Sequence, residues 1–245
     1  MEKKVLIPSD ILSPERLSRR KGYTIKMGRG TDEQTILEDV ADCDALLARN
    51  EHITRAIMEA APRLKVISKH GVGLDKIDLD AARELNIWVT NGPLSNTVAV
   101  AEHTMMLILA CAKKLVFFDR AARRGDYDIR NRVKGTDLEG KTLGLLGLGK
   151  IGHMVAKKAI NGFGMEVIGY DPSFLQTAGT RRWAAVRPWR RSSPAATSSL
   201  STCLHPGDPQ QRGPPFDRMM KPTAYLINAA RGDLIREADL AEALR

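Results

Sequence analysis

A glycine-rich stretch in the second half of the chain has the residue types and spacing of a phosphate-binding turn. It reads Gly147-Leu148-Gly149-Lys150-Ile151-Gly152, follows an apolar strand pattern at residues 142–146 and opens a helical pattern at residues 151–160. In such a turn the first glycine permits a tight bend, the second lets the backbone approach a pyrophosphate, and the third lets helix and strand pack closely. The N-terminus of the helix offers N–H groups and a partial positive charge to the phosphates.

An acidic residue stands where a dinucleotide site needs one. The next strand pattern, residues 166–170, ends in Asp171, which lies 22 residues beyond Gly149, close to the expected spacing of about 20. Its carboxylate would accept hydrogen bonds from ribose hydroxyls and repel a 2′-phosphate. The alternative is a glycine-rich turn followed by an ordinary strand-end Asp. The sequence predicts an NAD site with these cofactor-binding residues: Gly147, Gly149, Lys150, Ile151, Gly152 and Asp171.

Elements that could position this site alternate along the chain. Alternating strand and helix patterns favour a parallel sheet covered by helices, and therefore an α/β fold. A long helical pattern begins near Ser95 or Asn96, either of which could cap it, and we place a domain boundary there. Strand patterns stand at residues 4–7, 23–27, 45–48, 65–68 and 87–90. An apolar stripe predicted to face the core comprises Val98, Ala101, Met105, Ile108, Ala112 and Leu115.

Length and composition exclude several classes of protein. The chain has 245 residues, of which 43% are hydrophobic and 27% charged, as in an ordinary globular protein. Its longest apolar run, residues 105–112, is far shorter than the roughly 20 residues that span a bilayer, and we find no signal peptide. Cys43, Cys111 and Cys203 have neither metal-ligand nor disulfide spacing. We expect a cytoplasmic protein with no membrane partner and no bound metal.

The net charge of +9 does not indicate a nucleic-acid partner. Residues 180–218 hold seven Arg, two Asp and six of the twelve prolines, so +5 of the charge lies in this one segment. A basic surface spread over a folded nucleic-acid-binding module would be distributed differently. We therefore expect no nucleic-acid binding and treat residues 180–218 as anomalous.

Three blocks of sequence, in this order, carry a family pattern. The first runs from His70-Gly71-Val72-Gly73 through Asn91-Gly92-Pro93 to Ala101-Glu102-His103. The second runs from Leu138-Glu139-Gly140-Lys141 through Gly152 to Asp171-Pro172, and the third from Met220-Lys221-Pro222 to Arg231-Gly232. With these blocks the chain resembles the D-isomer-specific 2-hydroxyacid dehydrogenases, most closely their D-3-phosphoglycerate dehydrogenase branch.

The resemblance implies two doubly wound lobes with a cofactor cleft between them. Residues 1–95 would form a flavodoxin-like substrate-binding domain, and residues 96–245 a Rossmann NAD-binding domain that is incomplete at its C-terminus. The implied reaction is hydride transfer between NAD and C2 of a D-2-hydroxy acid or its 2-keto acid. The resemblance also implies a homodimer formed through the NAD-binding domain.

Roles for individual residues follow from the same resemblance. Arg231 matches the catalytic arginine, whose guanidinium can grip a carboxylate and polarise the adjacent keto group. It follows residues 225–228, which we expect to form a buried strand. An anion-binding turn would be formed by Gly71, Val72 and Gly73 for the substrate carboxylate. Asn96 would line the same cleft, with a helix cap as its alternative role, and Asn228, Ala229 and Ala230 would run past the nicotinamide.

The chain departs from the family pattern in its histidines. The acid/base histidine of the family follows a proline some tens of residues beyond the catalytic arginine, whereas none of the five histidines here follows a proline. We therefore expect the chain as written to be truncated and catalytically inactive. The rival reading is an NAD(H)-binding regulator without turnover, since transcriptional corepressors exist on the same scaffold.

The second departure is the anomalous segment, where the family pattern has a helix and then a buried strand. We expect residues 180–218 to be the product of a shifted reading frame, because permitted codons for residues 188–204 read in another frame give an amphipathic helix and that strand. The segment as written has few apolar residues, so we expect it to leave a gap in the sheet.

Overall fold

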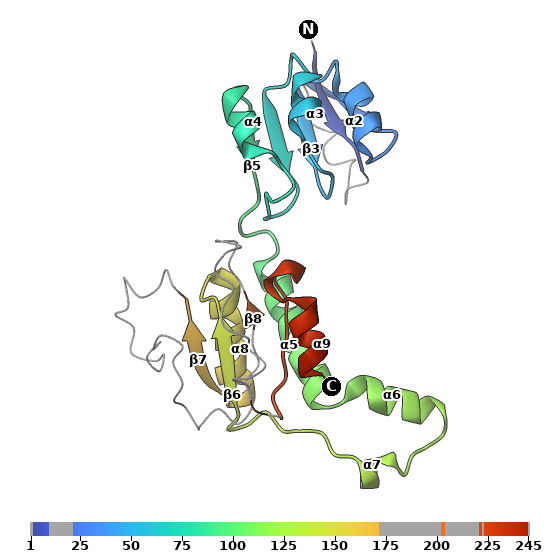
Figure 1. Ribbon diagram of the computed structural model, residues 1–245, viewed down its shortest axis with the longest axis vertical. Coiled ribbons are helices and arrows are strands. Elements are labelled where there is room, and N and C mark those ends of the chain that lie inside the picture. Colours follow the sequence, from blue (N-terminus) through green and yellow to red (C-terminus); the bar gives the residue numbers. More distant parts are fainter. Residues whose placement is uncertain (1, 10–21, 172–201, 204–220, 222, 245) are drawn as a thin grey trace. The chain divides into compact units, whose positions relative to one another are not determined.

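The computed structural model describes residues 2–9, 22–171, 202–203, 221 and 223–244 (Figure 1). By its internal contacts the chain separates into two compact units, Met1–Asn96 and Thr97–Arg245. Each unit has its own hydrophobic core. The predicted roles of the two parts, substrate binding and NAD binding, are a proposal taken up below.

The first unit is built on a five-stranded parallel sheet. Its strand order is β2-β1-β3-β4-β5, the order of the flavodoxin-like doubly wound fold, which confirms the predicted α/β class. The five strand patterns predicted from sequence all lie in this sheet. Its elements are β1 (Lys3–Ile7), β2 (Tyr23–Met27), α2 (Glu33–Val40), β3 (Ala45–Ala48), α3 (Arg55–Glu59), β4 (Val66–Lys69), α4 (Leu79–Glu84) and β5 (Trp88–Thr90).

Short polar side chains start the helices of this unit. Asp32 caps α2, Thr54 caps α3 and Asp78 caps α4, each by accepting a hydrogen bond from an N–H group in the first turn. The helices then bury one apolar face on the sheet, with Ile36, Ile57 and other residues packed against Leu6, Leu46 and Ile67. The carboxyl ends of the strands are thereby left for loops, which is where ligands bind in this architecture.

The second unit contains the glycine-rich turn. Its three strands are parallel and ordered β7-β6-β8, and α5 packs on α8 beside them (Figure 1). Gly164 ends α8 in the left-handed conformation, with φ of 60°. The elements are α5 (Thr97–Ala112), α6 (Leu115–Arg123), α7 (Ile129–Arg132), β6 (Thr142–Leu146), α8 (Lys150–Phe163), β7 (Glu166–Tyr170), β8 (Thr202–Cys203), η3 (Gly232–Leu234) and α9 (Glu237–Ala243).

The predicted apolar stripe on the long helix is correct only in its middle. Ala101, Met105, Ile108 and Ala112 are buried, whereas Val98 and Leu115 are more than half exposed. The helix α5 ends at Ala112, and Lys114 takes the left-handed conformation with φ of 52°, so Leu115 starts a separate helix on a new axis. The helical period therefore no longer applies at Leu115.

Most of the anomalous segment, residues 180–218, lies outside the described residues, and so do Pro172, Met220 and Pro222 of the family blocks. Two residues of the segment are described. Thr202 and Cys203 form β8 and pair in parallel with Leu145 and Leu146 of β6. The expected gap in the sheet is therefore wrong at this point, because strand pairing uses backbone groups that every sequence carries.

In the described parts of the chain, we find no helix with the length and apolar character needed to span a bilayer. Within the same residues, no three His, Cys, Asp or Glu side chains gather into a group that could hold a metal ion.

Candidate active site

The three glycines of the turn differ in what surrounds them. Gly147 has φ of 98°, a conformation that L side chains rarely adopt. A β-carbon on Gly152 would stand 2.3 Å from the carbonyl oxygen of Gly147, so no side chain fits between turn and helix. A β-carbon on Gly149 would meet no atom of the described residues within 4 Å, which leaves open space over the backbone in this part of the structure.

Open space at Gly149 adjoins the N-terminus of α8. Gly149 is the N-cap residue of this 14-residue helix, and no side chain caps it. The N–H groups of the first turn therefore remain available to an anion, which the helix dipole also favours. Lys150 is exposed and Ile151 half-buried in the same turn.

Asp171 lies directly beside the glycine turn. Its carboxylate is 7% exposed, and its Oδ2 accepts a hydrogen bond from the backbone N–H of Leu148 at 2.8 Å. The parallel pairing of β6 with β7 brings the two strand ends together. The structure therefore places the predicted ribose-binding carboxylate next to the predicted pyrophosphate-binding turn.

Arg231 lies in a second turn of the same unit, held by Asn228. The Asn228 side chain donates to the carbonyl oxygen of Arg231 at 2.7 Å and accepts from the N–H of Ala230 at 3.0 Å. The guanidinium is exposed and also donates to the carbonyl oxygen of Ala230 at 3.1 Å. Ala229, the fourth residue of this turn, is half-buried.

The segment before Arg231 differs from prediction. Residues 225–228 do not form a regular strand; Leu226 makes a single bridge, while Ile227 is buried in the core of the unit. One apolar anchor, rather than a strand ladder, fixes the start of the Arg231 turn.

The predicted carboxylate-binding turn lies in the first unit, after β4. Gly71 has φ of 142°, which favours glycine. The turn is held by the segment after β5: Gly92 N–H donates to the carbonyl oxygen of Gly71 at 2.9 Å, and the Asn91 side chain donates to that of Val72 at 2.7 Å. Among the described residues, neither Val72 nor Gly73 donates its N–H to a protein acceptor.

Two residues near this turn were missed by sequence reasoning. Asn91 holds the turn as described above, and Lys69 lies against it, because a β-carbon on Gly71 would stand 3.8 Å from Lys69 Cε. The available signals were a polar residue just after β5 and a basic residue at the end of β4. Asn96 is exposed in the turn that precedes α5, and no hydrogen bond from its side chain to Gly71, Val72 or Gly73 occurs among the described residues.

The structure thus groups the predicted site residues in three places. The glycine turn and Asp171 form one group, and Asn228 through Arg231 form another in the same unit. Gly71, Val72, Gly73 and Asn96 belong to the first unit.

Comparison with known proteins decides the family. The family model described as D-isomer specific 2-hydroxyacid dehydrogenase, catalytic domain, matches residues 5–225, which is most of the chain. The chain belongs to the D-isomer specific 2-hydroxyacid dehydrogenase family. The predicted resemblance is therefore confirmed.

Relatives in this family agree with the assignment. A D-3-phosphoglycerate dehydrogenase of Methanocaldococcus jannaschii is 38% identical over 226 residues, which are 90% of this chain and 42% of that protein. One of Mycobacterium tuberculosis is 34% identical over 245 residues, 98% of this chain and 46% of that protein. The chain thus spans less than half the length of these two relatives.

Solved structures share the fold of this chain. The 2-hydroxyacid dehydrogenase of Ketogulonicigenium vulgare Y25 matches with a TM-score of 0.82 and 27% identity, covering 100% of this chain and 78% of that one. A protein of Thermus thermophilus matches with a TM-score of 0.81 and 31% identity, covering 98% of this chain and 78% of that one.

Proposed function

We propose that the chain binds NAD and belongs to an oxidoreductase that acts on the CH–OH group of a D-2-hydroxy acid. One observation carries the proposal: the glycine turn leaves open space at Gly149 while the Asp171 carboxylate is fixed beside it by the Leu148 N–H. These are the two contact points that an adenine dinucleotide requires. The cofactor would supply the hydride acceptor or donor.

The residues of the second unit fit this cofactor. Gly149 and the uncapped first turn of α8 would hold the pyrophosphate with backbone N–H groups. Asp171 would accept hydrogen bonds from the adenine ribose hydroxyls. Asn228, Ala229 and Ala230 would line the nicotinamide, as the family resemblance implies.

Substrate binding would use cationic and N–H groups. The N–H groups of Val72 and Gly73 would hold the substrate carboxylate, and Arg231 would grip it and polarise the keto group during reduction. Gly71 supplies the positive-φ backbone of this turn, and Asn96 would line the same space.

A phosphorylated acid similar to 3-phosphoglycerate is the proposed substrate class. The relatives from Methanocaldococcus jannaschii and Mycobacterium tuberculosis are D-3-phosphoglycerate dehydrogenases. Arg49 directly follows β3 and Lys69 ends the neighbouring strand β4, so both basic residues lie at the carboxyl ends of paired strands and favour an anionic substrate. The predicted cytoplasmic location stays a prediction.

Two measurements test the function. NADH titrated into the purified chain should raise cofactor fluorescence with saturable binding. A panel of 2-keto acids, including phosphorylated ones, offered to a version of the protein that contains the acid/base histidine should show which acid is reduced. Absence of saturable NADH binding by a folded chain would overturn the proposal. Equal turnover of neutral and phosphorylated keto acids would overturn only the substrate class.

The chain as written is proposed to bind NADH without turnover. None of the histidines in its 245 residues follows a proline, as the acid/base histidine of the family does. NADH oxidation that depends on a 2-keto acid would contradict this. An NAD-binding regulator is the alternative, and NADH binding without turnover in a version that contains the acid/base histidine would favour it.

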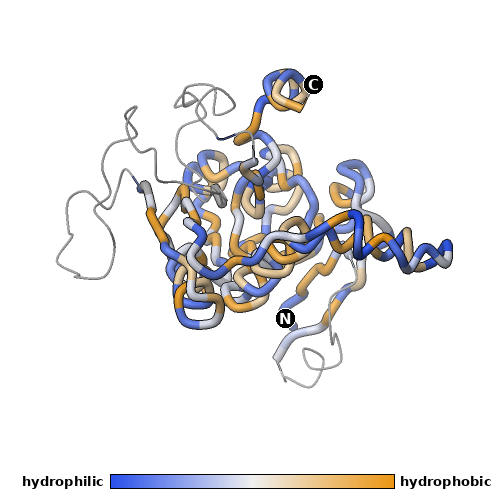
Figure 2. The backbone as a smooth tube through the Cα atoms, turned by 90° about the horizontal axis from the view of Figure 1, so that it is seen from below, coloured by the Kyte–Doolittle hydropathy of each residue, from blue (hydrophilic) through white to orange (hydrophobic). Residues whose placement is uncertain are grey.

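We further propose that a second copy of the chain covers α5 and α6. Leu115, Val116 and Phe117 at the start of α6 are 45–59% exposed, and Figure 2 shows hydrophobic and hydrophilic residues alternating along this helix. Exposed apolar patches of this kind mark interaction sites. Among the described residues of α6, only Ala121 is buried.

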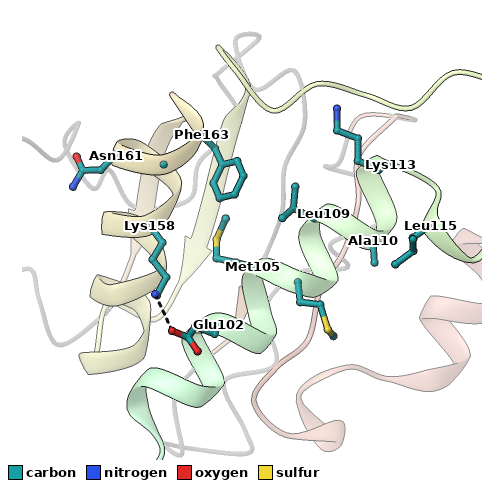
Figure 3. A pocket seen from close by; sticks show the side chains of 11 residues that line it. Glu102, Met105, Leu109, Ala110, Lys113, Leu115, Lys158, Asn161 and Phe163 are labelled. Atoms are coloured by element: carbon teal, nitrogen blue, oxygen red, sulfur yellow. Dashed lines mark hydrogen bonds and ion pairs between the residues drawn. The ribbon is translucent and has the colours of Figure 1, made fainter.

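An apolar hollow of about 790 Å³ lies beside this helix, between α5 and α8 (Figure 3). Met105, Leu109 and Phe163 face it, and Lys158 pairs with Glu102 across its end at 3.3 Å. A two-fold dimer would let the apolar start of α6 from one copy fill the hollow of the other. Phe117→Asp should convert a dimer to a monomer in light scattering. Tyr127→Asp, which replaces another exposed aromatic residue, should leave the dimer intact. A monomeric parent chain would overturn the proposal.

A further inference from the structure

Strand β7 contains Gly169, which lies against Leu148 of the glycine turn. Gly169 pairs with Leu145 of the neighbouring strand, and the side chain of Leu148 lies over it. A β-carbon on Gly169 would stand 2.5 Å from Cδ2 of Leu148 and 3.0 and 3.1 Å from its Cδ1 and Cγ atoms. Even an alanine at this position would therefore have to displace Leu148.

Leu148 is fixed at both of its ends. Its side chain is 5% exposed and belongs to the hydrophobic core of the second unit. Its backbone N–H donates to Asp171 at 2.8 Å, inside the protein. Displacement of the side chain in a close-packed core would move the backbone as well, since little free volume is available to absorb it.

We propose that Gly169 is a positioning residue for the dinucleotide. By leaving room for Leu148, it sets the separation between the glycine turn and the end of β7, and so the relative position of Gly149 and Asp171. One ligand must reach both points at once, with its pyrophosphate at Gly149 and its ribose at Asp171. This inference rests on the proposed NAD-binding function.

A positioning role and a merely structural role give different results. If Gly169 only permits folding, then Gly169→Ala lowers stability while the folded protein keeps its affinity for NADH. If Gly169 positions the turn, the folded variant binds NADH more weakly, and removing the obstructing leucine side chain restores the affinity. The rescue is specific, because Leu148→Ala removes the three atoms nearest to a β-carbon on Gly169.

The experiment uses four variants of the whole chain, with NADH titrated by fluorescence and folding checked by circular dichroism and thermal unfolding. Gly169→Ala should weaken NADH binding at least fivefold. Gly162→Ala is the matched control, because Gly162 is exposed in α8 and a β-carbon there meets no atom of the described residues within 4 Å, so NADH binding should stay within twofold of the parent. The double variant Leu148→Ala/Gly169→Ala should bind within twofold of Leu148→Ala alone.

Each outcome decides the inference. Unchanged NADH affinity in folded Gly169→Ala overturns it, and so does a double variant that is at least fivefold weaker than Leu148→Ala. If Gly169→Ala does not fold, the comparison of the double variant with Leu148→Ala decides. If the parent chain is folded but binds no NADH, the proposed function fails and the inference fails with it. If NADH binding is weakened only in Gly169→Ala, the proposed function stands.

Discussion

The backbone N–H of Leu148 donates to the buried carboxylate of Asp171 at 2.8 Å, so a hydrogen bond joins the glycine turn directly to the acid at the end of β7. One partner of this acid is the Leu148 N–H group, and the ribose of the proposed cofactor would be a further partner. Substitutions at Asp171 can separate these roles.

The first prediction concerns cofactor selectivity. Asp171→Asn retains an oxygen for the Leu148 N–H but removes the charge that would repel a 2′-phosphate, so NADPH should gain affinity relative to NADH. Asp171→Ala should also raise this ratio, but it leaves a buried N–H without a partner and should lower the free energy of unfolding by about 1–3 kcal/mol. Titration with both cofactors and urea unfolding check these results. An unchanged affinity ratio in both variants would contradict the role of Asp171.

The second prediction contrasts two glycines of the turn. The added methyl group of Gly149→Ala meets no atom of the described residues within 4 Å, so the thermal unfolding temperature should hardly change. The methyl group would, however, occupy the space of the pyrophosphate and weaken NADH binding more than tenfold. Gly152→Ala places a β-carbon against the Gly147 carbonyl oxygen and should lower both stability and binding. If Gly149→Ala binds NADH as tightly as the parent chain, the pyrophosphate does not lie there.

The third prediction concerns Arg231. In a version of the protein that reduces a 2-keto acid, Arg231→Lys should lose more than tenfold in turnover, about 1.4 kcal/mol of transition-state stabilisation, because lysine cannot make the two-pronged contact. NADH binding should survive. Arg236→Lys, on an exposed side chain that pairs with Asp239, is the matched control. A loss of less than tenfold would remove Arg231 from the catalytic role.

The fourth prediction concerns the turn in the first unit. Asn91→Ala removes the donor to the Val72 carbonyl oxygen, so the carboxylate-binding N–H groups should be less well ordered. In the same active version, KM for the keto acid should rise severalfold while NADH affinity stays unchanged. A fall in NADH affinity equal to the rise in KM would show a general loss of structure instead.

The fifth prediction concerns acid stability. The backbone N–H of Lys4 donates to the Asp44 carboxylate, and Lys3 and Arg63 form ion pairs with it. These contacts lower the pKa of Asp44 from 3.8 to about 2. Because the pKa is lower in the folded state, the carboxylate stabilises the first unit fully above pH 3.8, and this contribution is lost as the pH falls through about 2. Asp44→Asn should lower stability at pH 7 and flatten the decline between pH 4 and 2 in thermal unfolding. Asp80→Asn, at a carboxylate 82% exposed, should change neither.

Sequence reasoning succeeded where the information is local. The glycine turn, the strand before it and the acid after the next strand are recognisable because each follows from backbone conformation or from side-chain alternation within a short stretch. The same reasoning failed at Leu115, which continues the period of α5 in sequence but follows a left-handed break at Lys114. It also failed at residues 225–228, where an apolar run forms no regular strand.

By itself the sequence determined the family, the α/β class and the residues of the glycine turn. Only the tertiary structure showed that Asn91 holds Val72 and that Leu148 joins Gly169 to Asp171. These contacts join residues about 20 positions apart or more, or depend on the distance between two strand ends. Strand pairing and core packing set such distances, and the pattern of residues along one stretch of chain does not contain them.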